Sequence, residues 1–195
     1  MGVRRALLAA RRRWRALAAA ALCACALALH VPAQLAASEH FPAHAPAHLA
    51  HELAVFSNQP DITSWWVEED HSNYTTWRYS VSYTCGPRCS GRAHVLALAE
   101  PPAGAAPRHG PAASHRVELR LRSCTATPLL SWPHFCEELD LRAAVSEAAG
   151  GGAQLREEWR TRCSAIAWLS GACARRLRAR RDLLVTRLRA SHPAA

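Results

Sequence analysis

The stretch Thr76–Cys85 alternates without a break between two kinds of side chain. The aromatic and apolar residues all fall on one parity: Trp77, Tyr79, Val81, Tyr83 and Cys85. Period-two alternation places successive side chains on opposite faces of a β-strand, and aromatic and β-branched residues suit such a half-buried surface. A helix would instead spread these aromatics around its circumference. The stretch therefore predicts a strand with one buried face.

Three neighbouring segments extend this strand into a sheet. Ile62–Val67 precedes it across a polar turn, which predicts a hairpin. Arg92–Ala99 is an apolar run of strand length, and in His115–Cys124 the residues Val and Leu alternate with Arg and Glu. Such alternation predicts an antiparallel sheet with one face in solvent. Because a few strands alone are only marginally stable, other segments must cover the aromatic face.

The N-terminus has the pattern of a secretory signal. An Arg-rich stretch without acidic residues precedes Ala16–Leu29, which contains only Ala, Leu and Cys. This run is shorter than the roughly 20 residues that cross a bilayer, although it could extend to Ala37 as an uncleaved anchor. We therefore predict a signal peptide or signal anchor over residues 1–37, with the remainder in the lumen or outside the cell. An organellar transit peptide is the alternative, and the uninterrupted apolar run argues against it.

Residues 38–54 are predicted to form a His/Pro/Ala linker. Four histidines follow one another at spacings that would align them on one helix face: His40, His44, His48 and His51. Such a face would suit Zn²⁺ or Cu²⁺, but Pro42 and Pro46 interrupt the first half of that helix. His48 and His51 are the pair best placed to act as metal ligands.

Cysteine use indicates an oxidising compartment. Cys23 and Cys25 lie in the signal, and the other six are Cys85, Cys89, Cys124, Cys136, Cys163 and Cys173. An even number in a short secretory chain predicts disulfides. We expect the first four to pair among themselves, and Cys163 to pair with Cys173 or with the sheet. A thioredoxin-like motif is one residue too long here, and the paired spacing of a zinc cluster is absent.

The sequence contains one glycosylation motif, Asn73-Tyr74-Thr75, in the predicted hairpin turn. Asn73 is therefore a candidate site for an N-linked glycan.

The C-terminal part is predicted to be a helical extension over residues 137–190, followed by a disordered tail at 191–195. Cys136–Ala149 carries acidic residues in what would be the first helical turn. Ala153–Ala190 repeats apolar residues at three- to four-residue steps, with Gly171 as a break. The Arg residues that follow form a basic helix face.

Composition and motifs exclude several classes of function. All 24 basic residues are Arg and none is Lys, so the net charge of +9 reflects composition and does not indicate nucleic-acid binding. There is no Gly-rich phosphate loop, no His-Glu-x-x-His and no Gly-x-Ser-x-Gly. The sequence therefore argues against an enzyme, and we expect neither catalytic residues nor a cofactor.

The overall prediction is an α+β protein: a small antiparallel β-sheet or sandwich domain over residues 55–136, braced by disulfides, with C-terminal helices. We expect a secreted or type II membrane-anchored glycoprotein that acts as a binding or assembly module, with another protein or a membrane-surface component as partner. The alternatives are a luminal enzyme or a metal-binding protein that uses the His40–His51 tract. Sheet aromatics usually pack inward, but the aromatic cluster and the basic helix are the candidate contact surfaces: Trp65, Trp66, Trp77, Tyr79, Tyr83, Arg175, Arg176 and Arg180.

Overall fold

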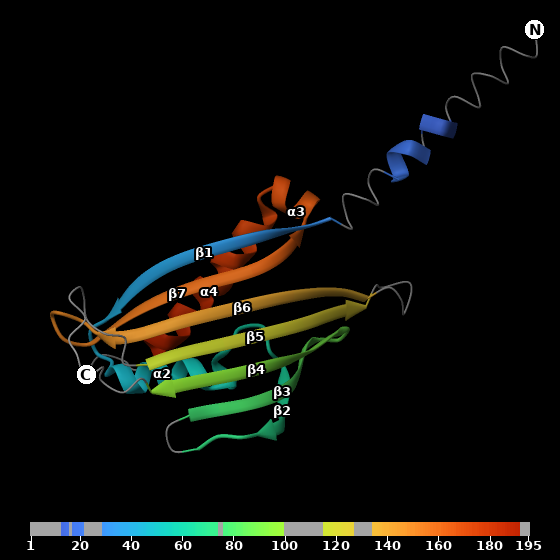
Figure 1. Ribbon diagram of the computed structural model, residues 1–195. Helices are drawn as coiled ribbons and strands as arrows, with labels where there is room; N and C mark the ends of the chain where they lie inside the picture. The colour runs from blue at the N-terminus through green and yellow to red at the C-terminus, as the bar shows by residue number, and fades with distance from the viewer. Residues whose placement is uncertain are drawn as a thin grey trace, which may run out of the picture.

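The computed structural model describes residues 13–15, 17–21, 29–73, 76–99, 115–126 and 134–191. A single seven-stranded antiparallel sheet dominates it, with strands in the order β1-β7-β6-β5-β4-β3-β2 (Figure 1). The strands are β1 His30–Phe41, β2 Ser64–Asp70, β3 Thr76–Gly86, β4 Cys89–Ala99, β5 His115–Ala126, β6 His134–Glu147 and β7 Ala153–Ser164. The helices are α2 Pro46–Ala54, the 3₁₀ turn η1 Phe56–Asn58, α3 Ala165–Leu169 and α4 Ala172–Ala190. The predicted α+β class, with its antiparallel sheet and C-terminal helix, is confirmed.

The first strand of the chain, β1, pairs with the last strand, β7. β2 to β7 follow one another as neighbours, while β1 lies at the far edge against β7. The register of that pair runs from His30 opposite Ser164 to Phe41 opposite Ala153. Residues 30–37, which the sequence analysis assigned to the signal, therefore lie in the sheet.

The predicted helix Cys136–Ala149 is wrong, and so is the first part of the predicted helix Ala153–Ala190, since both segments form strands, β6 and β7. In β6, Leu139, Leu141 and Val145 are all buried at odd positions, a spacing that also satisfies a helical pattern. In β7, the buried positions alternate as in any half-buried strand, but one of them is Glu157. A carboxylate at a core position hid the period-two pattern.

The predicted linker over 38–54 is also wrong. Its first residues complete β1, and Pro46 begins α2 at a first-turn position, where the missing amide hydrogen costs nothing. Leu49 and Leu53 are buried in the core on the sheet-facing side of this helix. The tail residues 192–195 lie outside the described part of the chain.

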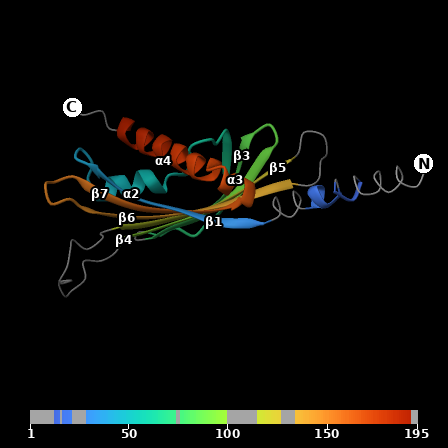
Figure 2. The same ribbon diagram turned by 90° about the horizontal axis from the view of Figure 1, so that it is seen from above.

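The sheet has one covered face and one charged face. α2 and α4 lie on the same side of it (Figure 2), and the core gathers there from every central strand, as with Val81, Val95, Leu119 and Leu141. On the opposite face, Arg and Glu occupy the alternate positions of β5, β6 and β7. This is the division between buried and solvated faces that antiparallel sheets commonly show.

Three disulfides join the six predicted cysteines. Cys85–Cys89 closes the β3–β4 turn, Cys124–Cys136 connects paired positions of β5 and β6, and Cys163–Cys173 links the end of β7 to the start of α4. The first four cysteines thus pair among themselves, as expected. Disulfides of this number are typical of proteins that fold in an oxidising compartment. None of the helices in the described residues is both long enough and apolar enough to span a membrane.

A buried ion-pair network fixes α4 to the sheet. Glu157 on β7 is 4% exposed and accepts hydrogen bonds from Trp159 Nε1, at 2.9 Å, and from Arg181 Nε on α4. Arg181 Nη2 also donates to Glu39 of β1 at 2.8 Å, and Arg189 contacts the same carboxylate. Burial alone would lower the pKa of Arg181, but its hydrogen bonds to the two carboxylates raise it above its usual value.

We expect Arg181→Met to lower the free energy of unfolding by about 3–5 kcal/mol, because it leaves the Glu157 carboxylate buried without its cation. Urea unfolding followed by circular dichroism would measure this loss. The matched control is Arg178→Met on the exposed side of the same helix, which should change stability by no more than about 0.5 kcal/mol. Equal effects of the two substitutions would contradict the role given to Arg181.

Candidate binding site

The predicted aromatic surface divides between the core and an edge strand. Tyr83 is 2% exposed on the covered face of the sheet. The Tyr79 hydroxyl donates to the carbonyl of Ala54 and accepts from the backbone amide of Phe56 at 3.1 Å. The Trp77 ring lies edge-on to His51 of α2, with ring centroids 4.4 Å apart. These three aromatics therefore belong to the contact between the sheet and its helices.

Trp65 and Trp66 lie instead on β2, at one edge of the sheet. They are 40% and 54% exposed, and every residue of β2 is exposed. Trp65 contacts Phe56 edge-to-face, with centroids 6.0 Å apart. The exposed aromatic surface of the sheet is thus smaller than predicted and is confined to this edge.

The predicted basic residues of α4 also separate into two groups. Arg175 Nη1 donates to the carbonyl of Ser170 at 3.1 Å, so it fastens the start of the helix. Arg176 and Arg180 line a crevice of about 280 Å³ between α4 and the sheet. The remaining lining comes from the turn before β2, from β6 and β7, and from α4 itself: Asp61, Glu137, Leu139, Thr161, Cys173, Leu177, Ala179 and Leu183.

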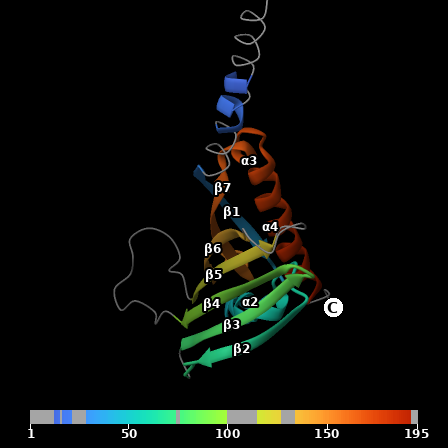
Figure 3. The ribbon, with the colours of Figure 1, turned by 90° about the vertical axis from the view of Figure 1, so that its right-hand side faces the viewer.

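Arg180 of α4 lies near Tyr83, one of the predicted aromatic contact residues. It is close enough to Tyr83 for its positive charge to oppose the effect of burial, which raises the pKa of the tyrosine above its usual value. α4 lies across the covered face of the sheet (Figure 3). The crevice opens between α4 and the part of the covered face that β6 and β7 form, and none of the predicted aromatic residues lines it.

The polar groups of this region are incompletely satisfied. Arg180 Nε is buried and has no hydrogen-bond partner among the described residues. The same holds for both amide atoms of Gln59, a residue 1% exposed in the turn that leads to Asp61. A buried donor without an acceptor costs about 1–3 kcal/mol. Arg180 lines the crevice, and its guanidinium can donate hydrogen bonds to a ligand or water oxygen there.

Asp61, at the rim of the crevice, has a left-handed backbone conformation with φ of 67°. Among the described residues other than Gly it is alone in this. Asp tolerates this region better than most residues. The turn that carries it is held to α4 by Arg187, whose Nη1 donates to the Gln59 carbonyl at 2.9 Å.

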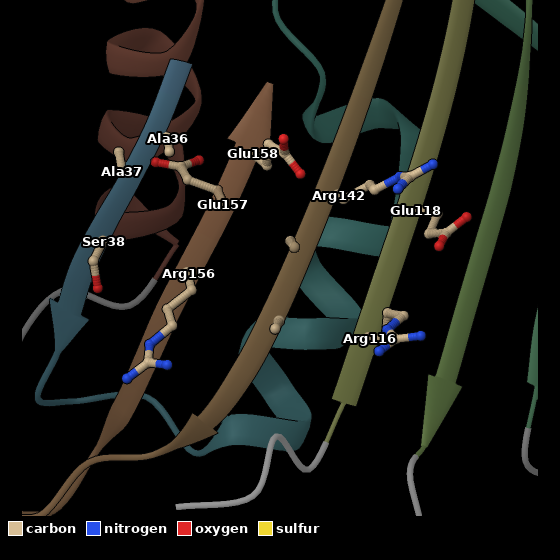
Figure 4. A pocket seen from close by; sticks show the side chains of 11 residues that line it. Ala36, Ala37, Ser38, Arg116, Glu118, Arg142, Arg156, Glu157 and Glu158 are labelled. Atoms are coloured by element: carbon tan, nitrogen blue, oxygen red, sulfur yellow. The ribbon is translucent and has the colours of Figure 1, made fainter. Parts of the chain in front are cut away.

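A larger hollow of about 720 Å³ lies on the charged face of the sheet (Figure 4). The small residues Ala36 and Ala144 are among its lining, and Arg and Glu side chains of β5, β6 and β7 surround it. Glu118 lies opposite Arg142, which in turn lies opposite Glu158. Opposite charges at paired positions stabilise a solvated sheet surface, and this role explains the residues of the hollow without a ligand.

Of the four histidines in the predicted metal tract, His44 and His48 lie side by side, with stacked rings whose centroids are 6.1 Å apart. His40 lies on β1, where its Nε2 is 3.0 Å from the Gly151 carbonyl, and the buried His44 contacts the Leu188 carbonyl of α4. Within α2, His48 lies 3.7 Å from Glu52, whereas His51 contacts Trp77. No group of three metal-ligating side chains occurs in the described part of the chain.

The candidate glycosylation site lies where it was expected. Asn73 is exposed in the turn between β2 and β3, and its Oδ1 accepts a hydrogen bond from the Thr76 amide at 2.8 Å. Tyr74 and Thr75 lie outside the described residues.

Of the ten residues that line the crevice, sequence reasoning predicted only Arg176 and Arg180 as contact residues. Asp61 sits in a turn, and Glu137 and Leu139 were assigned to a helix that is in fact β6. One residue could have indicated the crevice from the sequence: Leu183 is apolar but lies in the Arg-rich part of α4.

Comparison with known proteins finds no matching family model and no match among curated proteins. Several solved structures are similar. The lipid transfer and protein localization domain of human StarD13 (DLC2) has a TM-score of 0.46 and 17% identity, over 83% of this chain and 78% of that one. Ara h 8.0201 gives 0.41 and 12%, over 81% and 98%. The protein of unknown function SA2116 from Staphylococcus aureus gives 0.41 and 8%, over 83% and 96%.

The environment of Tyr79 predicts a pH dependence. Burial raises the pKa of Tyr79 to about 12, whereas in an unfolded chain it is about 10. Between these values the folded protein keeps a proton that the unfolded chain has lost, so the free energy of unfolding should fall as pH rises from about 10 to 12. Because the chain has no Lys, few other groups titrate in this window.

Urea unfolding of the wild type and of Tyr79→Phe at several pH values would test this. The variant should be less stable below pH 10 by about 1 kcal/mol, through the lost hydrogen bonds, and this difference should shrink and then reverse as the pH rises toward 12. A difference that stays constant with pH would contradict the assigned environment.

Proposed function

We propose that this protein is a disulfide-stabilised binding module of the secretory pathway, secreted or held by its N-terminal anchor. Its crevice between α4 and the sheet binds a small amphiphile with an anionic head group. The observation that supports this function is Arg180, which lines the crevice beside three Leu side chains and whose Nε is buried without a partner in the described residues.

The lining of the crevice supports an amphiphilic ligand. Leu139, Leu177 and Leu183 supply apolar surface, while Arg176 and Arg180 supply donors that suit a carboxylate or phosphate. A few polar groups on an apolar lining are typical of small-molecule sites.

The two carboxylates of the rim limit the charge of this ligand. Asp61 and Glu137 would repel a head group with several negative charges. A volume of about 280 Å³ lies at the lower end for ligand pockets. The expected ligand therefore has one anionic group and a short apolar chain.

The compartment is proposed on independent grounds. Three disulfides and the apolar segment that precedes β1 favour the secretory pathway. The exposed Asn73 in a luminal hairpin turn is accessible to glycosylation.

Binding of hexanoate, which carries one negative charge, to the full chain in lipid nanodiscs would test the crevice, with empty nanodiscs as background for calorimetry. Arg180→Met keeps the alkyl stem and removes the donor, so it should weaken binding about tenfold or more. Arg178→Met on the exposed side of α4 should leave affinity unchanged within about twofold.

Hexyltrimethylammonium, which has a similar chain and the opposite charge, should bind more weakly than hexanoate. Equal binding of both probes, or equal effects of the two Arg substitutions, would contradict an anion-selective crevice.

Intact mass of the protein from secreting cells, with and without glycosidase, would test the compartment. Because β1 begins at His30 and pairs with β7 over its whole length, we expect the mature N-terminus at or before that residue. We also expect a glycan that Asn73→Gln removes. Loss of residues 30–37, or an unmodified Asn73, would contradict the respective expectation.

A further inference from the structure

α3 leaves its large apolar side chains in solvent. Ile166 is 44% exposed, Trp168 is 50% exposed and Leu169 is 77% exposed, and no residue of this helix is buried. We call Ala165–Leu169 the apolar tip. Contiguous exposed apolar residues of this kind mark a surface that contacts another apolar phase.

The apolar tip has a defined structure. The Cys163–Cys173 disulfide joins the chain on its two sides. The Ser164 hydroxyl caps the helix by accepting from the Ala167 amide at 3.3 Å. At its far end, the Gly171 amide donates to the Trp168 carbonyl at 3.0 Å. The side chains are therefore exposed on a fixed support, which a frayed helix end would not provide.

The position of the apolar tip identifies the partner. The Ala165 amide donates to the Leu29 carbonyl at 2.9 Å, and Leu29 is the last residue of the apolar run Ala16–Leu29. Leu29 itself is 62% exposed. α3 lies at the end of the sheet where β1 begins (Figures 1 and 3). The apolar tip thus contacts the residue at which the candidate membrane anchor meets the folded domain.

We propose that the apolar tip inserts into the interfacial region of the bilayer that holds the Ala16–Leu29 segment. A run this much shorter than about 20 residues draws its ends toward the hydrocarbon. The interfacial layer is roughly 5 to 7 Å thick on each side, so a helix hydrogen-bonded to Leu29 lies within reach of it. Trp is the residue most typical of this layer.

Charged residues around the apolar tip fit the same partner. Arg162 at the end of β7 and Arg175 at the start of α4 are both exposed. Beside an inserted apolar surface, an Arg side chain can keep its aliphatic part against the apolar phase while its guanidinium contacts lipid phosphates. The segment and the apolar tip would then hold the domain at two points, which fixes its orientation on the membrane.

Quenching by brominated lipid would test this with the full chain, reconstituted into phosphatidylcholine vesicles with brominated or ordinary acyl chains. The fluorescence emission of Trp168 is obtained by subtracting the emission of Trp168→Phe from that of the wild type. The matched control is Trp66→Phe, because Trp66 is similarly exposed, at 54% against 50%, but lies on β2 at the opposite edge of the sheet from β1. Both substitutions are conservative, and circular dichroism would check the fold.

We expect the Trp168 emission to fall at least about twofold in brominated vesicles, since interfacial Trp lies beside the acyl chains. The Trp66 emission should not change. A Trp168 emission that brominated lipid leaves unchanged would overturn the proposal and would indicate that a protein or a second copy covers the apolar tip. Cleavage of the native chain within residues 16–29 would also overturn it.

Discussion

The buried pair of Glu157 and Arg181 is the contact on which the arrangement of this molecule depends. Glu157 occupies a core position of β7, where a carboxylate is stable only if a cation reaches it. Arg181 supplies that cation from α4 and also contacts Glu39 of β1. The Arg181 guanidinium therefore joins the long helix to both β1 and β7.

α4 is attached to the sheet at its start and in its second half, and the crevice lies between these two attachments. The Cys163–Cys173 disulfide attaches its start, while Arg181 and Arg189 attach its second half to Glu39 and Glu157. Between these attachments the side of the helix that carries Arg176 and Arg180 faces the Asp61 turn across an open space. A helix with fewer attachments could close onto the sheet and remove this space.

Sequence alone predicts β2, β3, β4 and β5, but not β1, β6, β7 or the site. Thr76–Cys85 and His115–Cys124 alternate clearly because their covered positions are all apolar. β7 escapes recognition because Glu157 breaks that pattern, and β1 because its small residues continue the composition of the signal. The crevice depends on where α4 crosses the sheet, and the long-range Glu157–Arg181 contact that decides this leaves no local pattern.

The pairing of β1 with β7 also governs the order in which the chain can fold during synthesis. β1 is the first strand to be made, but its partner ends at Ser164. At about 5–20 residues per second, residue 164 follows residue 41 by roughly 6 to 25 seconds. During that interval β1 has no partner strand, and the amphipathic meander from β2 to β6 must form while its final edge is still missing. The nascent chain therefore depends on protection from aggregation until its C-terminal third has been translated.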